Sequence, residues 1–226
     1  MGTSSCRTDI AFLHTSLVHI ETFNALAAEL APELVIAHAV REDLLSAAEK
    51  AGFVTPVLDL KAQEALMALR DKGARVVVCT CSTLGASAEA LAEETGFSYL
   101  RIDRPMADLA VATGARIGVA ACAPTTVPNT QALIRSSAAK AGRAVEISTF
   151  VFDDVWRLFG EGRLDDYYAG IAARLADAAR DVDVLVLAQA SMAPAATLCV
   201  DMAAPVLSSP RIGFKAAVEA VRQSAD

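Results

Sequence analysis

Short apolar runs alternate with longer stretches of helical periodicity along the whole chain. Runs of small and branched apolar residues predict eight strands, at residues 10–13, 34–38, 75–80, 99–102, 116–121, 144–149, 182–188 and 205–207. Alanine-rich and amphipathic stretches predict seven helices, near residues 18–30, 42–52, 60–72, 84–94, 127–142, 163–180 and 210–223. Several strand runs are apolar without alternation, which is typical of parallel strands covered by helices on both faces. The pattern therefore predicts the α/β class.

Two pairs of predicted strands repeat at nearly the same spacing. RVVVCTCST at 75–83 aligns without gaps with DVLVLAQAS at 183–191, and this places Cys81 opposite Gln189, 108 residues later. IAFLHTS at 10–16 aligns with IGVAACA at 117–123 at an offset of 107. Chance is the plainer explanation, because every α/β protein has many such strands. The nearly equal offsets of 107 and 108 favour instead two pseudo-symmetric, flavodoxin-like lobes with parallel sheets.

The repeat also predicts how the chain is divided. The first lobe is expected over residues 1–100, with the closing helix at 208–226 packing back on it, and the second lobe over residues 101–207. A cleft is expected between the lobes. Ligands of open parallel sheets bind outside the carboxyl ends of the strands, and Cys81 and Gln189 both occupy such places.

Composition narrows the range of functions. Apolar residues make up 54% of the 226 residues, which is enough for a substantial core. No long uninterrupted apolar run predicts a membrane span, and the first residues lack the apolar core of a secretory signal. A net charge of −7 argues against nucleic acid or an anionic membrane as partner. We expect a cytoplasmic protein.

The five cysteines fit neither a zinc ribbon nor a redox pair. They stand at positions 6, 79, 81, 122 and 199, and we expect reduced thiols. Cys6, Cys79 and Cys199 are interpreted as small buried apolar residues, with Cys199 inside a helix.

Cys81 differs because it lies where a strand ends and a helix begins. The first amides of a helix carry partial positive charge, which favours the thiolate form of a nearby cysteine. Ser82 and Thr83 could donate hydrogen bonds to a bound anion, or could simply cap the helix. Cys81 is thus the candidate catalytic residue.

His14 ends the first predicted strand. In a 2-1-3-4 strand order the first strand neighbours the third, so His14 is expected near Cys81, where an imidazolium could stabilise a thiolate or carry a proton. The alternative is a structural polar group at a strand end. His19 and His38 share no metal-ligand spacing with His14, so no metal is expected.

Small hydroxyl residues follow several predicted strands. Together with helix amino termini they would suit a small carboxylate. The candidate substrate-binding residues are Thr15, Ser16, Ser82, Thr83, Thr125, Thr126, Gln189 and Ser191. Arg104 could also bind a carboxylate, although a solvated loop is the alternative interpretation of its RIDRPM segment.

The order of these segments resembles a known superfamily. The carrying segments are IAFLHTS at 10–16, CST at 81–83, RIGVAACAPTTV at 116–127, VDVLVLAQASMAPAA at 182–196 and APVLSSPRIGFKAAVEAV at 204–221. They are similar to the segments of the aspartate/glutamate/hydantoin racemase superfamily, and CST resembles its first cysteine motif. The resemblance implies two lobes, no cofactor and commonly a homodimer. It also implies proton transfer by two opposed thiols at the carbon next to a carboxylate.

The chain departs from this superfamily at the second thiol, where it has Gln189. Glutamine neither takes up nor releases a proton at neutral pH, so symmetric two-thiol racemisation is in doubt. Four functions stay open. They are Cys81-mediated proton transfer in an isomerase or racemase, a one-thiol decarboxylase or lyase, a Cys81/His14 nucleophilic hydrolase, and a carboxylate-binding protein without catalysis.

Overall fold

The computed structural model describes residues 8–224, and Cys6 lies outside this range. It has eight strands: β1 (Thr8–His14), β2 (Ile36–Val40), β3 (Ala74–Cys79), β4 (Tyr99–Arg101), β5 (Arg116–Ala121), β6 (Glu146–Val151), β7 (Val184–Leu187) and β8 (Val206–Ser208). All eight correspond to predicted strands, with ends displaced by at most a few residues.

All seven predicted helices are also present. They are α1 (Val18–Leu30), α2 (Glu42–Ala51), α3 (Pro56–Asp71), α4 (Gly85–Thr95), α6 (Thr126–Lys140), α8 (Leu164–Ala178) and α10 (Ser209–Gln223). Three α-helices and one 3-10 turn were not predicted: α5 (Arg104–Thr113), α7 (Asp153–Gly160), α9 (Ala193–Ala196) and η1 (Ala190–Met192). The alternative interpretation of the segment around Arg104 as a solvated loop is therefore wrong, because α5 begins at Arg104. Pro105 stands in the first turn of α5, where its fixed φ favours a helix start.

The strands form two four-stranded parallel sheets with the same topology. Their strand orders are β2-β1-β3-β4 and β6-β5-β7-β8, which confirms the predicted α/β class and strand order. The pairing registers agree as well: Leu13 of β1 lies opposite Cys79 of β3, and Ala120 of β5 lies opposite Leu187 of β7. These pairs are related by the same offsets, 107 and 108, that the sequence repeat gave. The repeat is therefore structural.

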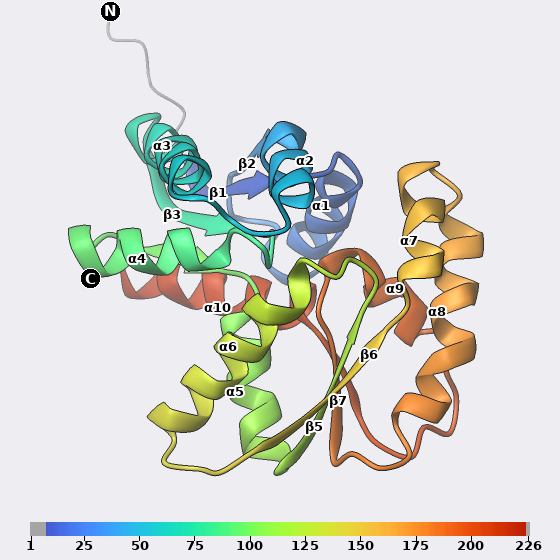
Figure 1. The fold of residues 1–226 in the computed structure, drawn as a ribbon. Coiled ribbons are helices and arrows are strands. Elements are labelled where there is room, and N and C mark those ends of the chain that lie inside the picture. Colours follow the sequence, from blue (N-terminus) through green and yellow to red (C-terminus); the bar gives the residue numbers. More distant parts are fainter. Residues whose placement is uncertain (1–7, 225–226) are drawn as a thin grey trace, which may run out of the picture. The chain divides into compact units, whose positions relative to one another are not determined.

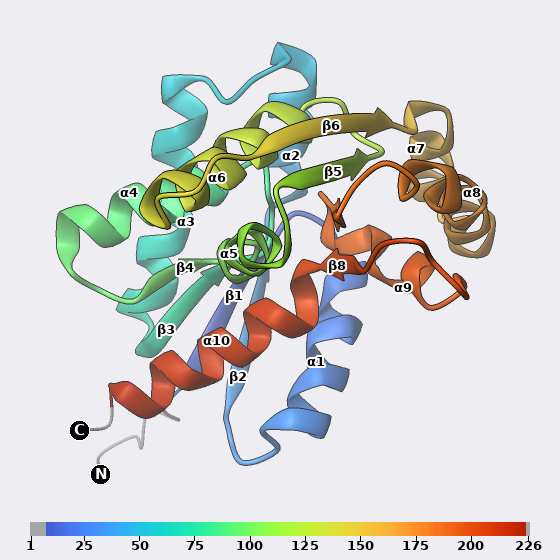
Figure 2. The same cartoon turned by 90° about the horizontal axis from the view of Figure 1, so that it is seen from below.

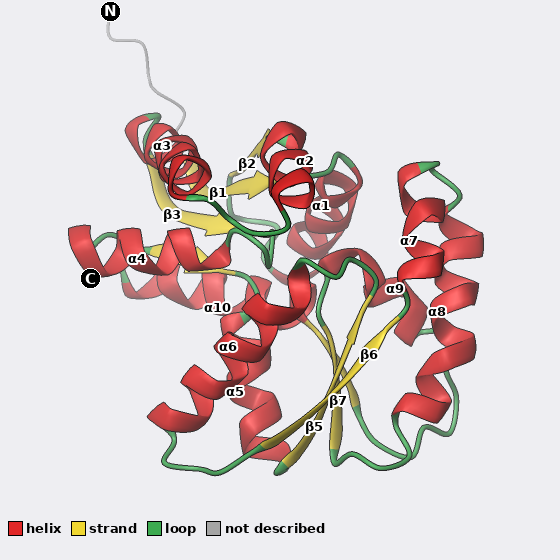
Figure 3. Cartoon of the chain, in the orientation of Figure 1, coloured by secondary structure: helices red, strands yellow, loops and turns green. Residues whose placement is uncertain are grey.

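The chain divides into two compact units. One comprises the residues up to Ile102 together with those from Pro210 onward, and the other spans Asp103–Ser209. Each unit has its own sheet with helices packed against it (Figures 1 and 3). The binding cleft that the sequence predicts between the halves stays a prediction.

In the first unit, both faces of the sheet are buried. Alternate residues of a strand point to opposite faces, so Leu13 and Cys79 join one apolar cluster and Phe12 and Val78 another. Helices α2, α3 and α4 cover the first face, whereas α1 and α10 cover the second. Figure 2 shows α10 beside α1 on this face, although the two helices stand at opposite ends of the chain. Phe214, for example, lies 6.1 Å from Phe12 between ring centroids.

The helix α10 approaches the end of β4 very closely. A side chain at Gly213 would overlap the carbonyl oxygen of Ile102, so only glycine fits there. This contact fixes α10 against the sheet of the first unit and explains why a glycine stands inside a helix.

In the second unit, one apolar cluster joins the sheet to α7 and α8. Leu185 and Leu187 of β7 pack there with Ile171 and Leu175 of α8. Helices α5 and α6 pack against each other and also contact the strands of this sheet. Among residues 8–224, no helix is both long enough and apolar enough to cross a membrane.

Candidate functional site

Cys81 lies just beyond β3, two residues after the strand ends. The side chains of Thr15 and Thr83 and the backbone amides of Thr83 and Leu84 lie near its sulfur and favour the thiolate form. The Leu84 N–H itself donates to the backbone carbonyl of Cys81 at 3.1 Å. Thr15 comes from the neighbouring strand end. The parallel sheet places these donors together because the carboxyl ends of β1 and β3 meet at the same edge.

The protonation of Cys81 differs from the sequence expectation. The residue is buried, with 8% of its surface exposed, and it borders the apolar cluster beneath α2, α3 and α4. Burial raises the pKa of Cys81, and the hydrogen bonds from Thr15, Leu84 and Thr83 lower it by less. The predicted bias toward thiolate is therefore wrong in net direction. The group is a buried thiol beside polar groups that favour its thiolate form but do not outweigh the effect of burial.

The capping interpretation of Ser82 and Thr83 is also wrong. Leu84 stands at the N-cap position of α4, and its apolar side chain has no acceptor. The Thr83 side chain lies near the Cys81 sulfur, where it favours the thiolate form. Ser82 and Thr83 are both buried. Neither of them occupies the N-cap position of α4.

His14 has a different role from the one expected. Its Nδ1 lies 2.8 Å from Thr80 Oγ1, and its Nε2 lies 2.8 Å from His38 Nδ1. Because Thr80 donates its own hydroxyl to Leu13 O, His14 Nδ1 carries the proton and donates to Thr80. Both ring nitrogens are therefore used in a chain of hydrogen bonds within the first unit.

The charge state of His14 argues against catalysis as well. Burial, followed by the proximity of His19 and His38, lowers the pKa of His14 to about 3. Burial lowers the pKa of His19 to about 4. A neutral imidazole with both nitrogens occupied provides no imidazolium for Cys81. The structural alternative for His14 is the one the geometry favours, and the Cys81/His14 hydrolase loses its base.

In the second unit, Gln189 occupies the place that corresponds to Cys81. Its Oε1 accepts from the backbone N–H of Cys122 at 2.6 Å and from that of Ala123 at 3.2 Å. Cys122 in turn corresponds to Thr15, at the offset of 107. The two units therefore repeat one arrangement, in which a residue after the first strand contacts a residue after the third.

A second polar network lies beside Gln189. Cys122 lies beside Tyr167 of α8, whose hydroxyl lies 3.1 Å from Ser191 Oγ. Burial raises the pKa of Cys122 to about 12 and also raises the pKa of Tyr167. All three groups are therefore neutral at physiological pH. Tyr167 was not among the predicted residues, since only its position on the apolar face of a predicted helix marks it in the sequence.

The remaining candidates are placed as follows. Thr15 is buried and Ser16 half-buried at the end of β1, while Thr125 and Thr126 begin α6. Thr125 stands at the N-cap, but its side chain does not cap the helix. Arg104 donates to Ser137 Oγ at 2.9 Å and thus serves the packing of α5 on α6.

Cys199 is not a helical residue. It follows α9 by two residues of turn and is partly buried, so the expectation that it lies inside a helix is wrong. In residues 8–224 all four cysteines are free. Within the same range, no group of three or more histidine, cysteine, aspartate or glutamate side chains could hold a metal ion.

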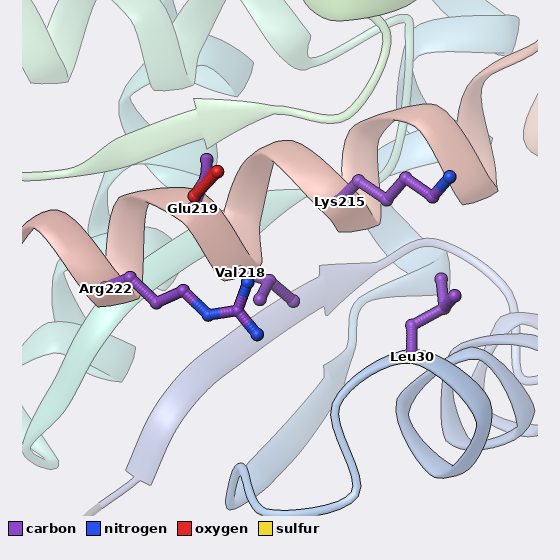
Figure 4. A pocket seen from close by; sticks show the side chains of 5 residues that line it. All are labelled: Leu30, Lys215, Val218, Glu219 and Arg222. Carbon is purple, nitrogen blue, oxygen red and sulfur yellow. The ribbon is translucent and has the colours of Figure 1, made fainter.

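A surface groove on the first unit contains none of these residues. It encloses about 290 Å³, and Leu30 of α1 faces Lys215, Val218, Glu219 and Arg222 of α10 across it (Figure 4). Arg222 is already paired with Glu33. Among the described residues, the groove is lined by no cysteine and no histidine, so the site is better sought at the strand ends.

The duplicated topology, with Cys81 and Gln189 at matching strand ends, defines the two-lobed α/β class that the sequence resembled. Solved racemases have the same fold. Glutamate racemase RacE1 from Bacillus anthracis superposes with a TM-score of 0.69 at 16% identity, covering 96% of this chain and 82% of that one. An aspartate racemase homologue from Pyrococcus horikoshii gives 0.68 at 12% identity, covering 95% and 99%.

Allantoin racemase from Klebsiella pneumoniae is similar to the same degree. It gives a TM-score of 0.67 at 18% identity, covering 96% of this chain and 88% of that chain. No family model and no curated protein sequence matches the chain. The predicted resemblance to the racemase superfamily is thus confirmed at the level of the fold.

Proposed function

We propose that this protein is an enzyme of the racemase and isomerase type that moves a proton at the carbon next to a carboxylate, with Cys81 as the catalytic residue. Its substrate would be a small amino acid or a related carboxylic acid. Two lines support the proposal. Proteins of this fold include racemases named for aspartate, glutamate and allantoin. The chain also has a thiol at the carboxyl end of a central strand, surrounded by hydrogen-bond donors.

The donors around Cys81 are the observation that carries the proposal. A structural cysteine in an apolar core needs no polar neighbours, whereas Thr15, Thr83 and the amide of Leu84 lie beside the Cys81 sulfur and favour its thiolate form. Donors that contact an ion bind it more tightly than they bind the neutral form, so this arrangement selectively stabilises a thiolate. It therefore lowers the barrier to any step that leaves the negative charge on sulfur.

The proton-transfer step can be written with all atoms assigned. The Cys81 S–H proton passes to the carbanion carbon, a C–H bond forms, and the electron pair of the S–H bond stays on sulfur. The thiolate that results is stabilised by the nearby groups of Thr15, Thr83 and Leu84. In the reverse direction the thiolate removes the proton from that carbon, and the thiol then exchanges its proton with water. The net result of the two directions is exchange of the hydrogen on that carbon with solvent, without a cofactor.

A one-thiol lyase or decarboxylase is the second candidate, because of the protonation of the site. The raised pKa of Cys81 keeps it a proton donor at neutral pH. Gln189 replaces the second thiol, and the neighbouring Cys122, with its pKa near 12, also stays protonated. Such a set of groups suits delivery of one proton to a carbanion that loss of another group has generated.

Solvent isotope exchange tests the proposal. Aspartate, glutamate and 2-substituted malonates, with both enantiomers of the amino acids, are incubated with the enzyme in D₂O. Deuterium at the carbon next to the carboxylate is then measured by mass spectrometry. We expect exchange with at least one amino acid, or deuterated product and CO₂ from a malonate in the case of the second candidate. The Cys81→Ala variant should lose this activity.

Cys199→Ala is the matched control, because Cys199 is a free cysteine outside the candidate residues. It should keep the rate of the unmodified protein. Undiminished exchange in Cys81→Ala would contradict the assignment of Cys81. A complete lack of exchange with carboxylate binding retained would favour the binding protein. The expected homodimer, the cytoplasmic location and the independence of a cofactor stay predictions.

A further inference from the structure

The amide of Gln189 has one end fixed and one end free. Two backbone N–H groups, of Cys122 and Ala123, donate to Oε1, so the amide cannot be turned over without placing donors against donors. This defines the other end as an N–H₂ group. Gln189 Nε2 is buried and has no hydrogen-bond partner among residues 8–224. The residue as a whole is 8% exposed, so this donor is almost fully removed from bulk solvent.

A buried donor without an acceptor is unfavourable. Leaving such a group unpaired costs about 1–3 kcal/mol, so proteins rarely keep one without a reason. A second polar atom nearby along the chain shares this property. Thr125 Oγ1 is also buried without a partner in the described residues, and Thr125 follows Ala123 by two positions. Both atoms belong to loops that leave the carboxyl ends of neighbouring strands, β7 and β5.

We infer that Gln189 Nε2 donates a hydrogen bond to a carboxylate oxygen of the substrate. The choice of a carboxylate rests on the proposed function, which requires one next to the reacting carbon. A neutral N–H donor matches an oxygen of that group. Gln189 is therefore a binding residue that selects hydrogen-bond acceptors, and it stands where a second proton-transfer group would otherwise be.

This inference differs from a structural role in what Gln189 must contact. A purely structural glutamine would also pair the donor end of its amide within the protein, as Gln63 does when its Nε2 donates to Asp59 at 2.9 Å. Gln189 uses only the acceptor end. The alternative occupant of the donor end is a tightly held water molecule, which a carboxylate would not displace.

Acetate is the simplest probe, because it has the carboxylate and little else. ¹⁵N-labelled protein is titrated with sodium acetate to about 0.1 M, with sodium chloride as the control at equal ionic strength. We expect the side-chain NH₂ signals of Gln189 to shift saturably with acetate alone. The NH₂ signals of Gln63 should stay in place in both titrations. No saturable shift at Gln189 would overturn the inference in favour of water.

Two variants complete the test. Gln189→Glu keeps an oxygen for the N–H groups of Cys122 and Ala123 but replaces the free donor by an acceptor. It should weaken acetate binding, followed at those backbone amides, by at least about tenfold. Unchanged affinity would contradict the inference. Cys81→Ala should bind acetate normally while lacking isotope exchange, so that failure of the proposed function and failure of this inference give different results.

Discussion

Lowering the pH should destabilise the first unit through its buried histidines. His14 is fully buried and neutral, with its pKa lowered to about 3, whereas an unfolded histidine titrates near 6.5. Below pH 6.5 the unfolded chain takes up a proton that the folded chain excludes. The free energy of unfolding is therefore unaffected above about pH 7 and falls as the pH drops from about 6.5 toward 3.

The magnitude follows from the separation of the two pKa values. Each pH unit below 6.5 contributes about 1.4 kcal/mol until the folded state also binds the proton. At pH 5 this amounts to about 2 kcal/mol for His14. His19 adds a similar loss, because its pKa is lowered to about 4.

A variant isolates the contribution of His14. Gln at position 14 can still donate to Thr80, but it does not titrate. Urea unfolding of the unmodified protein and of His14→Gln is followed by circular dichroism at pH 7 and pH 5. The difference in unfolding free energy between the two proteins should change by about 2 kcal/mol between these pH values. Titrations of groups distant from His14 cancel in this comparison.

His38→Gln is the comparison variant, because His38 also has a pKa lowered by burial but is only partly buried, whereas His14 is fully buried. It should show a smaller change than His14→Gln. If the difference for His14→Gln is the same at both pH values, His14 is not a neutral buried group. Its assignment as a structural residue would then be refuted, and an imidazolium beside Cys81 would have to be considered again.

Two further predictions concern the groups around the reacting carbon. Thr15→Val removes the hydroxyl beside the Cys81 sulfur at nearly constant shape, and it should slow isotope exchange about 10- to 100-fold. Thr15→Ser keeps the hydroxyl and should keep most of the rate. Equal rates in both variants would show that Thr15 does not stabilise the thiolate. Gln189→Cys supplies a thiol at the position that corresponds to Cys81. Chiral chromatography should then detect racemisation of a substrate whose hydrogen the unmodified protein only exchanges with solvent. Equal racemisation by both proteins would contradict the assignment of Gln189 as a group that transfers no proton.

The strands and their order could be predicted because local residues determine them. Runs such as VVVC and VLVL are buried on both faces. The offset of 108 residues between these two runs nearly equals the offset of 107 between the first strands of the two sheets, and this reflects a duplicated sheet. Helix α5 could not be predicted in this way, because its charged first turn resembles a loop. Helix α7 is short, and tertiary contacts stabilise it: the rings of Trp156 and Phe159 lie 4.9 Å apart, and that of Phe159 lies 5.3 Å from Tyr167.

The sequence allows candidate site residues to be proposed from their places at strand ends, but it does not give their electrostatics. The strand-to-helix junction identifies Cys81 and the donors that follow it. Its net pKa depends on burial beneath α2, α3 and α4, which no local pattern reports. The partners of His14 likewise depend on register, since β1 and β3 pair so that Thr80, not Cys81, lies beside it.

The stereochemistry of deuterium uptake tests most directly whether a single thiol transfers the proton. An amino acid that exchanges in D₂O is recovered at partial conversion, and its configuration is determined together with its deuterium content. Transfer by Cys81 alone predicts that deuterium enters with retention of configuration and that Cys81→Ala incorporates none. Loss of configuration as fast as deuterium enters would show a second proton-transfer group and would contradict the account.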